Sequence, residues 1–155
     1  DLSRPTVERF LFLLEQTYVI RIVRPYSRNL RTELFKTPKV FLCDTGMMQL
    51  LWLKQLQREV LGPVFETSVF VELLKLYGPE FVAYWRTADK KEIDFIVQRP
   101  QAPLPVEVKL RFPQTTPPAV RSFFQRDAAE PEYRVVGLYG QPADEHMVYP
   151  WQLYL

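Results

Sequence analysis

Four charged residues lie close together in the sequence, in two short segments that have the pattern of strands. Glu92 and Asp94 belong to the segment Glu-Ile-Asp-Phe-Ile-Val, and Glu107 and Lys109 belong to Pro-Val-Glu-Val-Lys. Successive side chains of a strand alternate between the two faces of a sheet, so the members of each pair share a face. The apolar residues around them are expected on the opposite face: Ile93, Phe95, Val97, Val106, Val108 and Leu110. Three carboxylates and a lysine on one face predict either a chemical site or a solvated surface with weak ion pairs.

These residue types suit the hydrolysis of a phosphodiester bond. That reaction requires neutralisation of the phosphate charge and formation of hydroxide near pH 7, and a carboxylate-held Mg²⁺ or Mn²⁺ does both. Mg²⁺ prefers oxygen ligands and keeps several waters, so Asp94, Glu107 and the backbone carbonyl of Val108 would suffice as metal ligands. Lys109 would orient the attacking water or stabilise the charge on phosphorus. Glu92 shares the face of Asp94 and is the weaker candidate for this site.

A further carboxylate comes from a helix that the sequence predicts over residues 64–77, with Pro63 at its first position. Glu66 falls on the apolar side of this helix, in line with Val69, Phe70, Leu73 and Tyr77. A carboxylate on a buried face needs a partner or a function, so we expect Glu66 to add a metal ligand or to hold a metal-bound water. The alternative is that Glu66 lies near the rim, in the first turn, where the helix dipole stabilises it.

The other patterns predict the elements that must position these residues. The first part should contain an amphipathic helix, two strands around a basic loop, and a second helix: 3–18, 18–23, 39–43 and 47–60. The second part should contain a helix, three strands, a helix and a buried strand: 64–77, 81–86, 92–97, 105–110, from 117 onward, and 133–139. We therefore divide the chain into residues 1–61, a partial winged-helix-like segment, and residues 62–155, an α/β domain.

The tripeptide Asp44-Thr45-Gly46 after an apolar strand also matches the catalytic signature of aspartic proteases. Those enzymes pair two such aspartates, whereas this sequence contains one copy, followed by a helical pattern. Asp44 or Thr45 as the N-cap of that helix explains the tripeptide. We therefore reject a protease.

Composition predicts a globular, intracellular protein. The chain has 155 residues, of which 47% are hydrophobic, and a chain of this length buries roughly 70% of its unfolded surface. No segment approaches the roughly 20 apolar residues that span a bilayer. The single Cys43 excludes a disulfide framework, and no signal peptide is present, so a cytoplasmic location is expected. The first residue is Asp and a helix begins almost at once, which suggests a domain cut from a longer chain.

Basic residues gather in one part of the chain. Residues 1–62 contain ten Lys and Arg against six Asp and Glu, whereas residues 63–155 contain ten against twelve. This excess predicts a surface that binds the phosphates of a nucleic acid, with a solvated basic loop as the alternative. The residues concerned are Arg21, Arg24, Arg28, Arg31, Lys36 and Lys39.

The order of elements and acidic residues resembles the PD-(D/E)XK nuclease superfamily, to which many restriction enzymes and archaeal junction resolvases belong. Here a helix with Glu66 precedes three strands, Glu-Ile-Asp stands where Pro-Asp often stands, and Glu107-Val108-Lys109 supplies the Glu-x-Lys motif. The resemblance implies a restriction-endonuclease-like αβββαβ core with a central mixed sheet flanked by helices. It also implies catalytic roles for Asp94, Glu107, Lys109 and Glu66.

A second resemblance rests on seven short motifs, in this order: Tyr-Ser-Arg-Asn-Leu (26–30), Lys-Thr-Pro-Lys-Val (36–40), Asp-Thr-Gly-Met (44–47), Phe-Glu-Thr-Ser-Val (65–69), Tyr-Trp-Arg-Thr (84–87), Glu-Ile-Asp-Phe (92–95) and Val-Glu-Val-Lys (106–109). Together they resemble the domain-of-unknown-function family 4143, found as the C-terminal part of AAA+ type ATPases in bacteria and archaea. The resemblance implies an upstream ATPase domain as partner. This sequence contains nothing like a Walker A motif, so we expect no ATP site in it.

Three functions remain open at this point. The first is a Mg²⁺-dependent nuclease that acts on DNA, with RNA as the alternative substrate. The second is a nucleic-acid-binding module with an inactive site, in which the basic residues between 21 and 39 make the main contacts with the nucleic acid. The third is a protein-interaction domain with Trp52 and Trp151 in its contact surface.

Overall fold

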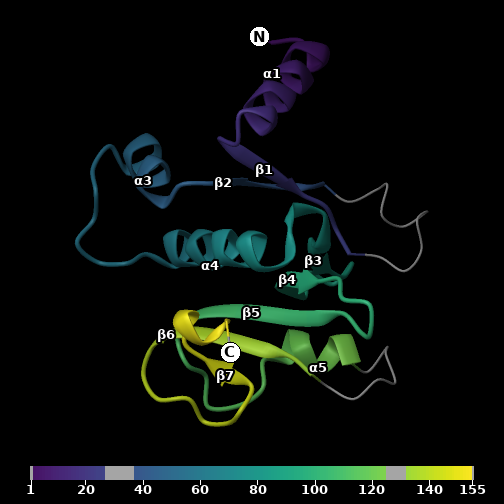
Figure 1. Ribbon diagram of the computed structural model, residues 1–155, viewed down its shortest axis with the longest axis vertical. Helices are drawn as coiled ribbons and strands as arrows, with labels where there is room; N and C mark the ends of the chain where they lie inside the picture. The colour runs from purple at the N-terminus through teal and green to yellow at the C-terminus, as the bar shows by residue number, and fades with distance from the viewer. Residues whose placement is uncertain (1, 27–36, 125–131, 155) are drawn as a thin grey trace.

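The computed structural model of the protein describes residues 2–26, 37–124 and 132–154. These residues form a mixed α/β structure, in which helices flank a five-stranded mixed sheet and a separate pair of strands lies beside it (Figure 1). The predicted α/β class with a central mixed sheet is therefore confirmed. No helix among the described residues is both long enough and apolar enough to cross a membrane.

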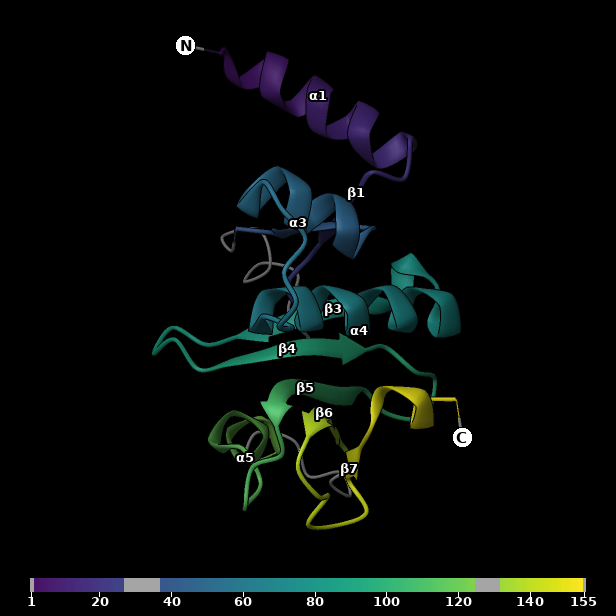
Figure 2. The same cartoon turned by 90° about the vertical axis from the view of Figure 1, so that its left-hand side faces the viewer.

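The described residues of the N-terminal part form two helices and a two-stranded ribbon. Helix α1 (Arg4–Gln16) begins after Ser3, whose side chain accepts a hydrogen bond from the amide of Thr6. Strands β1 (Ile20–Val23) and β2 (Lys39–Leu42) pair in antiparallel fashion, as predicted. No residue of α1 is buried, and both views show this helix projecting beyond the ribbon (Figures 1 and 2). The predicted apolar stripe of this helix is thus left largely uncovered.

Helix α3 (Thr45–Leu53) confirms the capping role of the Asp-Thr-Gly tripeptide. Asp44 Oδ1 accepts a hydrogen bond from the amide of Met47 at 2.5 Å. The helix is shorter than the predicted range 47–60, because Lys54 adopts a left-handed backbone conformation with φ of 59° and ends it. Helices commonly end at a residue with left-handed backbone conformation, usually Gly. A lysine at this position does not indicate a helix end in the sequence.

The central sheet has the strand order β3-β4-β5-β6-β7. Strands β3, β4 and β5 are antiparallel neighbours, whereas β5, β6 and β7 are parallel. Helix α5 lies in the connection between β5 and β6. The bounds are α4 (Gly62–Tyr77), β3 (Val82–Arg86), β4 (Glu92–Val97), β5 (Leu104–Arg111), α5 (Pro118–Phe124), β6 (Arg134–Tyr139) and β7 (Met147–Val148), with short 3₁₀ turns at Pro79–Phe81 and Pro150–Gln152. The sequence pattern missed β7, which has only two residues.

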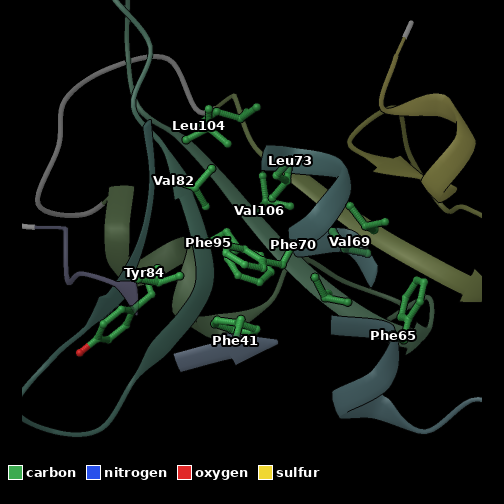
Figure 3. Close-up of a cluster of buried hydrophobic side chains, with 14 residues drawn as sticks. Phe41, Phe65, Val69, Phe70, Leu73, Val82, Tyr84, Phe95, Leu104 and Val106 are labelled. Carbon is green, nitrogen blue, oxygen red and sulfur yellow. The ribbon is translucent and has the colours of Figure 1, made fainter. Parts of the chain in front are cut away.

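The two faces of the sheet carry different helices and different hydrophobic clusters. Figure 2 shows α4 on one side of β4 and β5 and α5 on the other. Under α4, Phe41 of β2 packs against Phe70 and Phe95 with ring centroids 4.5 and 5.5 Å apart (Figure 3). The cluster under α5 contains Trp85, Ile93, Ile96, Val120, Phe123 and Val135. The ribbon therefore contributes to the same core as α4.

A β-bulge in β4 corrects the predicted alternation of its side chains. Ala83 pairs with Ile96 and Trp85 pairs with Ile93, so Asp94 and Phe95 together lie opposite Tyr84. Consequently Ile93 packs in the cluster under α5, whereas Phe95 and Val97 pack under α4. The prediction that Ile93 shares a face with Phe95 and Val97 is wrong, because the bulge inserts one extra residue between them.

The end of β1 attaches the ribbon to the edge of the sheet. Tyr84 of β3 donates its amide to the carbonyl of Arg24 at 3.1 Å, and Pro25 forms an isolated bridge with Tyr84. The hydroxyl of Tyr84 donates to the carbonyl of Thr37 at 2.6 Å, close to the start of β2. Tyr84 therefore contacts the residue after β1 and a residue just before β2, at one end of the ribbon, next to the bulge that carries Asp94.

Candidate active site

Asp94 lies where β4 and β5 stop pairing. The last paired residues are Phe95 and Val106, and one step further the same register would place Asp94 opposite Glu107. Asp94 Oδ2 accepts a hydrogen bond from the amide of Val108 at 2.8 Å. Burial raises the pKa of Asp94, although this hydrogen bond and the charge of Lys109 oppose the rise. The structure therefore brings Asp94 next to the Glu107-Val108-Lys109 motif, as the sequence predicts.

Glu107 is the most deeply buried carboxylate of the site, with 5% of its surface exposed. Its Oε1 accepts a hydrogen bond from Lys109 Nζ at 2.6 Å, whereas Oε2 is buried and has no hydrogen-bond partner among the described residues. Burial, followed by the charge of Asp94, raises the pKa of Glu107 to about 7. A buried carboxylate oxygen without a partner is unfavourable unless a proton or a cation compensates it.

Lys109 points its ammonium group at this pair of acids. Although burial opposes it, the hydrogen bond to Glu107 and the charges of Glu107, Asp94 and Glu66 raise the pKa of Lys109. The ammonium is therefore fully protonated near neutral pH, and it remains partly accessible, with 45% of the side chain exposed. Because Glu107 holds the ammonium of Lys109 while the side chain stays partly exposed, this ammonium can also contact an anionic ligand.

Glu66 faces the same site from the first turns of α4. It lines an open cleft of about 380 Å³ together with Asp94, Val108 and Lys109. Burial, followed by the charge of Asp94, raises the pKa of Glu66. The helix geometry explains this placement, since the buried residues Phe65, Val69 and Phe70 fix α4 on the sheet and leave Glu66 at its edge.

Lys39 joins the site from the other part of the chain. Its Nζ lies 2.5 Å from Glu92 Oε1 and 3.6 Å from Glu66 Oε1. Although burial opposes it, the hydrogen bond to Glu92 and the charges of Glu66, Glu92 and Asp94 raise the pKa of Lys39. The sequence assigned Lys39 to the basic surface, and no local pattern indicated that it would cross to the acidic residues.

Glu92 lies at the outer side of the cluster. Besides Lys39, it contacts Arg86 of β3, with Arg86 Nε 3.5 Å from Glu92 Oε2. Arg86 and Glu92 are directly paired in the β3–β4 register. Glu92 therefore pairs with two cations, Lys39 and Arg86.

The oxygen ligands of the site suit a hard divalent cation held by two carboxylates. Among residues 2–26, 37–124 and 132–154, no three His, Cys, Asp or Glu side chains gather as a metal-binding group. Mg²⁺ is commonly bound by one or two carboxylates and keeps several waters, so Asp94 and the unpartnered Oε2 of Glu107 fit such an ion. Glu66 does not fit it as directly, because its carboxylate is engaged by Lys39.

The basic residues predicted to bind nucleic acid are only partly described. Arg24 is exposed, and the guanidinium of Arg21 lies over the ring of Tyr18 at 4.7 Å from its centroid. Arg28, Arg31 and Lys36 lie outside the described residues. The basic surface therefore stays a prediction.

Comparison with known families agrees with the resemblance for the larger part of the chain. Residues 61–154 match the family described as Domain of unknown function (DUF4143), and the chain belongs to this family. Residues 1–58 match another family, described as Domain of unknown function (DUF8612). The motifs expected to belong to the first family at 26–30, 36–40 and 44–47 thus fall in the segment that matches the second.

Two curated mycobacterial proteins are similar to this chain. They are the uncharacterized proteins Rv2008c of Mycobacterium tuberculosis and Mb2031c of Mycobacterium bovis, each 29% identical over 114 residues. The alignment covers 70% of this chain and 26% of each relative. The chain thus spans about a quarter of the length of the curated relatives it matches. No solved structure matches the chain.

Proposed function

We propose that residues 62–155 form a PD-(D/E)XK-type nuclease domain that hydrolyses phosphodiester bonds of DNA with the help of Mg²⁺ or Mn²⁺. The observation that carries this proposal is the contact between Asp94 and the Glu107-Val108-Lys109 segment, with the buried Oε2 of Glu107 left without a partner. Acidic residues on a solvated sheet surface would be exposed, whereas these are buried and paired with a lysine. Buried acidic residues of this kind are typical of functional sites.

The order of elements supports the same proposal. From α4 onward the chain runs helix, three antiparallel strands, helix and a strand parallel to the third. This order agrees with the αβββαβ order expected of a restriction-endonuclease-like core, with Glu66 on the first helix and the acidic residues on the second and third strands. Fold order alone does not establish an activity, so the site residues carry more weight.

The roles of the residues follow from their surroundings. Mg²⁺ bound at Asp94 and Glu107 would neutralise phosphate charge and make hydroxide available near pH 7. The backbone amide of Val108 fixes Asp94, and Lys109 donates hydrogen bonds to an anionic oxygen of the substrate. Glu66 holds a water in the cleft or acts as a further ligand.

The activity is expected within a longer protein. The aligned region covers 26% of each mycobacterial relative, and the resemblance implies an AAA+ type ATPase domain upstream of this domain. We propose that the upstream ATPase domain is the partner of this domain and that the protein acts in the cytoplasm.

The test is a cleavage assay with labelled linear, branched and single-stranded DNA and with RNA, in Mg²⁺ or Mn²⁺. We expect cleavage by the wild type and a loss of at least about 100-fold in Asp94→Asn and Lys109→Ala. Lys75→Ala is the matched control, since Lys75 pairs with Glu72 on α4 outside the site. Absence of cleavage on every substrate, or equal cleavage by Asp94→Asn, would refute the proposal.

A protein-interaction domain with an inactive site is the second candidate function. It is favoured by the large apolar side chains that α1 and α3 expose to solvent: Val7, Phe10, Phe12, Leu13, Leu14, Met47, Leu50, Leu51 and Trp52. Exposed apolar surface of this kind often marks an interface. Light scattering of the chain, alone and mixed with the purified upstream part of the longer protein, tests this candidate, and a monomer that binds nothing there would count against it.

A nucleic-acid-binding module is the third possibility, and the exposed Arg24 with Arg21 nearby is its structural support. Such binding would weaken steeply with rising salt. Arg21→Glu combined with Arg24→Glu should then abolish it, and unchanged affinity would remove this function.

A further inference from the structure

Among the residues that the structure describes, Lys39 is the site residue that comes from outside the 61–154 family match. Its ammonium contacts Glu92 at 2.5 Å and Glu66 at 3.6 Å. The three side chains are only 25%, 30% and 28% exposed, so these pairs are partly shielded from water. Partly buried ion pairs are held more firmly than the exposed pairs of a protein surface.

The backbone around Lys39 is fixed from several sides. Lys39 is the first residue of β2 and pairs with Val23 of β1, which is buried. Tyr84 donates its hydroxyl to the carbonyl of Thr37 at 2.6 Å, and its ring lies 5.3 Å from Lys39 Nζ. Two residues further along β2, Phe41 packs against Phe70 of α4. The fold therefore holds the backbone of Lys39 in place, so that its side chain reaches the acidic residues.

The charges of the site divide into two halves. On one side Lys109 neutralises Glu107, while Asp94 is held by the amide of Val108. On the other side Lys39 is shared by Glu66 and Glu92. A divalent cation that uses Glu66 as a ligand would therefore meet an ammonium that already contacts this carboxylate.

We propose that Lys39 is a positioning residue of the active site, an internal counter-ion that holds Glu66 and Glu92 and competes with a divalent cation for Glu66. The inference rests on the proposed function in that a divalent cation binds at Asp94 and Glu107 and takes Glu66 as a further ligand. It makes the β1–β2 ribbon part of the site, so the segments that match two different families form one functional unit. The affinity for the cation is then set by a residue of the N-terminal segment.

The experiment measures Mn²⁺ binding directly, by electron paramagnetic resonance of free Mn²⁺ or by calorimetry, on the full 155-residue chain. Lys39→Met keeps the aliphatic stem and removes the charge, and we expect on the order of tenfold tighter Mn²⁺ binding. Lys39→Arg keeps the charge and should bind Mn²⁺ within about twofold of the wild type. Lys75→Met is the matched control, because Lys75 pairs with Glu72 on the exposed side of α4, and it should leave the affinity unchanged.

A background substitution separates competition at Glu66 from a general charge effect. In Glu66→Gln the carboxylate that Lys39 occupies is absent, so adding Lys39→Met should change Mn²⁺ affinity less than about threefold. An equal gain in both backgrounds, no gain from Lys39→Met, or no Mn²⁺ binding by any variant would overturn the proposal. If Lys39→Met does not fold, as judged by circular dichroism, Lys39→Gln replaces it in the same cycle.

The same variants distinguish this inference from the proposed nuclease function. If Mn²⁺ binding changes as expected while no nucleic acid is cleaved, the role of Lys39 stands and the nuclease function fails. If cleavage is found but Lys39→Met leaves Mn²⁺ affinity unchanged, the nuclease function stands and the role of Lys39 fails.

Discussion

The carboxylate of Asp94 accepts a hydrogen bond from the backbone amide of Val108 at 2.8 Å, just beyond the last residue pair that joins β4 to β5. A buried backbone amide needs a partner, and here a side chain supplies it where the strand ladder ends. The same contact fixes the carboxylate of Asp94, which lines the cleft together with Glu66 and Lys109. One hydrogen bond thus serves both the local structure and the site.

The two roles of Asp94 predict different results for two substitutions. Asp94→Asn keeps an oxygen that accepts the Val108 amide and removes a buried charge, so its free energy of unfolding should equal or slightly exceed that of the wild type. Asp94→Ala leaves the Val108 amide without this acceptor and should lower the free energy of unfolding by about 1–3 kcal/mol. Urea denaturation in EDTA measures both, and equal stability of Asp94→Ala and Asp94→Asn would contradict the expected role of the hydrogen bond.

Local sequence signals predicted the elements that carry the site. The prolines at 63 and 118 mark the starts of α4 and α5, and Asp44 caps α3 as expected. The two segments that carry the site acids became β4 and β5, nearly with the predicted bounds. Helix starts, caps and strand patterns depend on residues that are neighbours in the chain. They can therefore be predicted from the sequence.

Features that depend on distant residues were missed. The bulge at Asp94 and Phe95 is defined by their pairing with Tyr84 in another strand, and period-two alternation cannot show it. The contact of Lys39 with Glu66 and Glu92 depends on how the β1–β2 ribbon docks against the edge of the sheet. Strand β7 is defined by its pairing with β6, and its two residues are too few to show a periodicity in the sequence.

The raised pKa of Glu107, about 7, predicts how stability depends on pH. The folded protein binds a proton at Glu107 more tightly than the unfolded chain, so this contribution to stability is complete below the ordinary carboxyl pKa. It is lost as pH rises from about 4.5 to about 7. Glu107→Gln cannot lose a proton, so the unfolding free energy of the wild type minus that of Glu107→Gln should fall by about 3 kcal/mol across this interval.

Urea denaturation at pH 4.5, 6 and 8 in EDTA measures this difference. Glu145→Gln is the control, because Glu145 is exposed and its replacement should leave the pH profile parallel to that of the wild type. If the difference in unfolding free energy between wild type and Glu107→Gln stays constant with pH, Glu107 has the same pKa in the folded and the unfolded protein.

Gly137 in β6 lies directly under the ring of Phe112. A Cβ added at Gly137 would come within 2.4 Å of the ring, and Phe112 is itself buried and packs edge-on against Tyr149. Gly137→Ala should therefore lower the free energy of unfolding by about 1–3 kcal/mol. Phe112→Leu in the same chain should recover part of this loss, and Gly62→Ala, which meets nothing within 4 Å, is the control. Additive effects of Gly137→Ala and Phe112→Leu would argue against this contact.

Tyr84 joins the N-terminal ribbon to the sheet through its hydroxyl group, which donates to the carbonyl of Thr37 at 2.6 Å. Tyr84→Phe removes only this hydrogen bond and should lower the free energy of unfolding by about 1 kcal/mol. Because Thr37 lies two residues before Lys39, hydrogen exchange should increase selectively at the amides of β2 and remain unchanged in β5 and β6. Tyr133→Phe is the matched control, since its hydroxyl contacts Thr116 on the other side of the sheet. A uniform increase in exchange across both regions would show that the Tyr84 hydroxyl stabilises the whole fold and does not specifically hold the ribbon at the site.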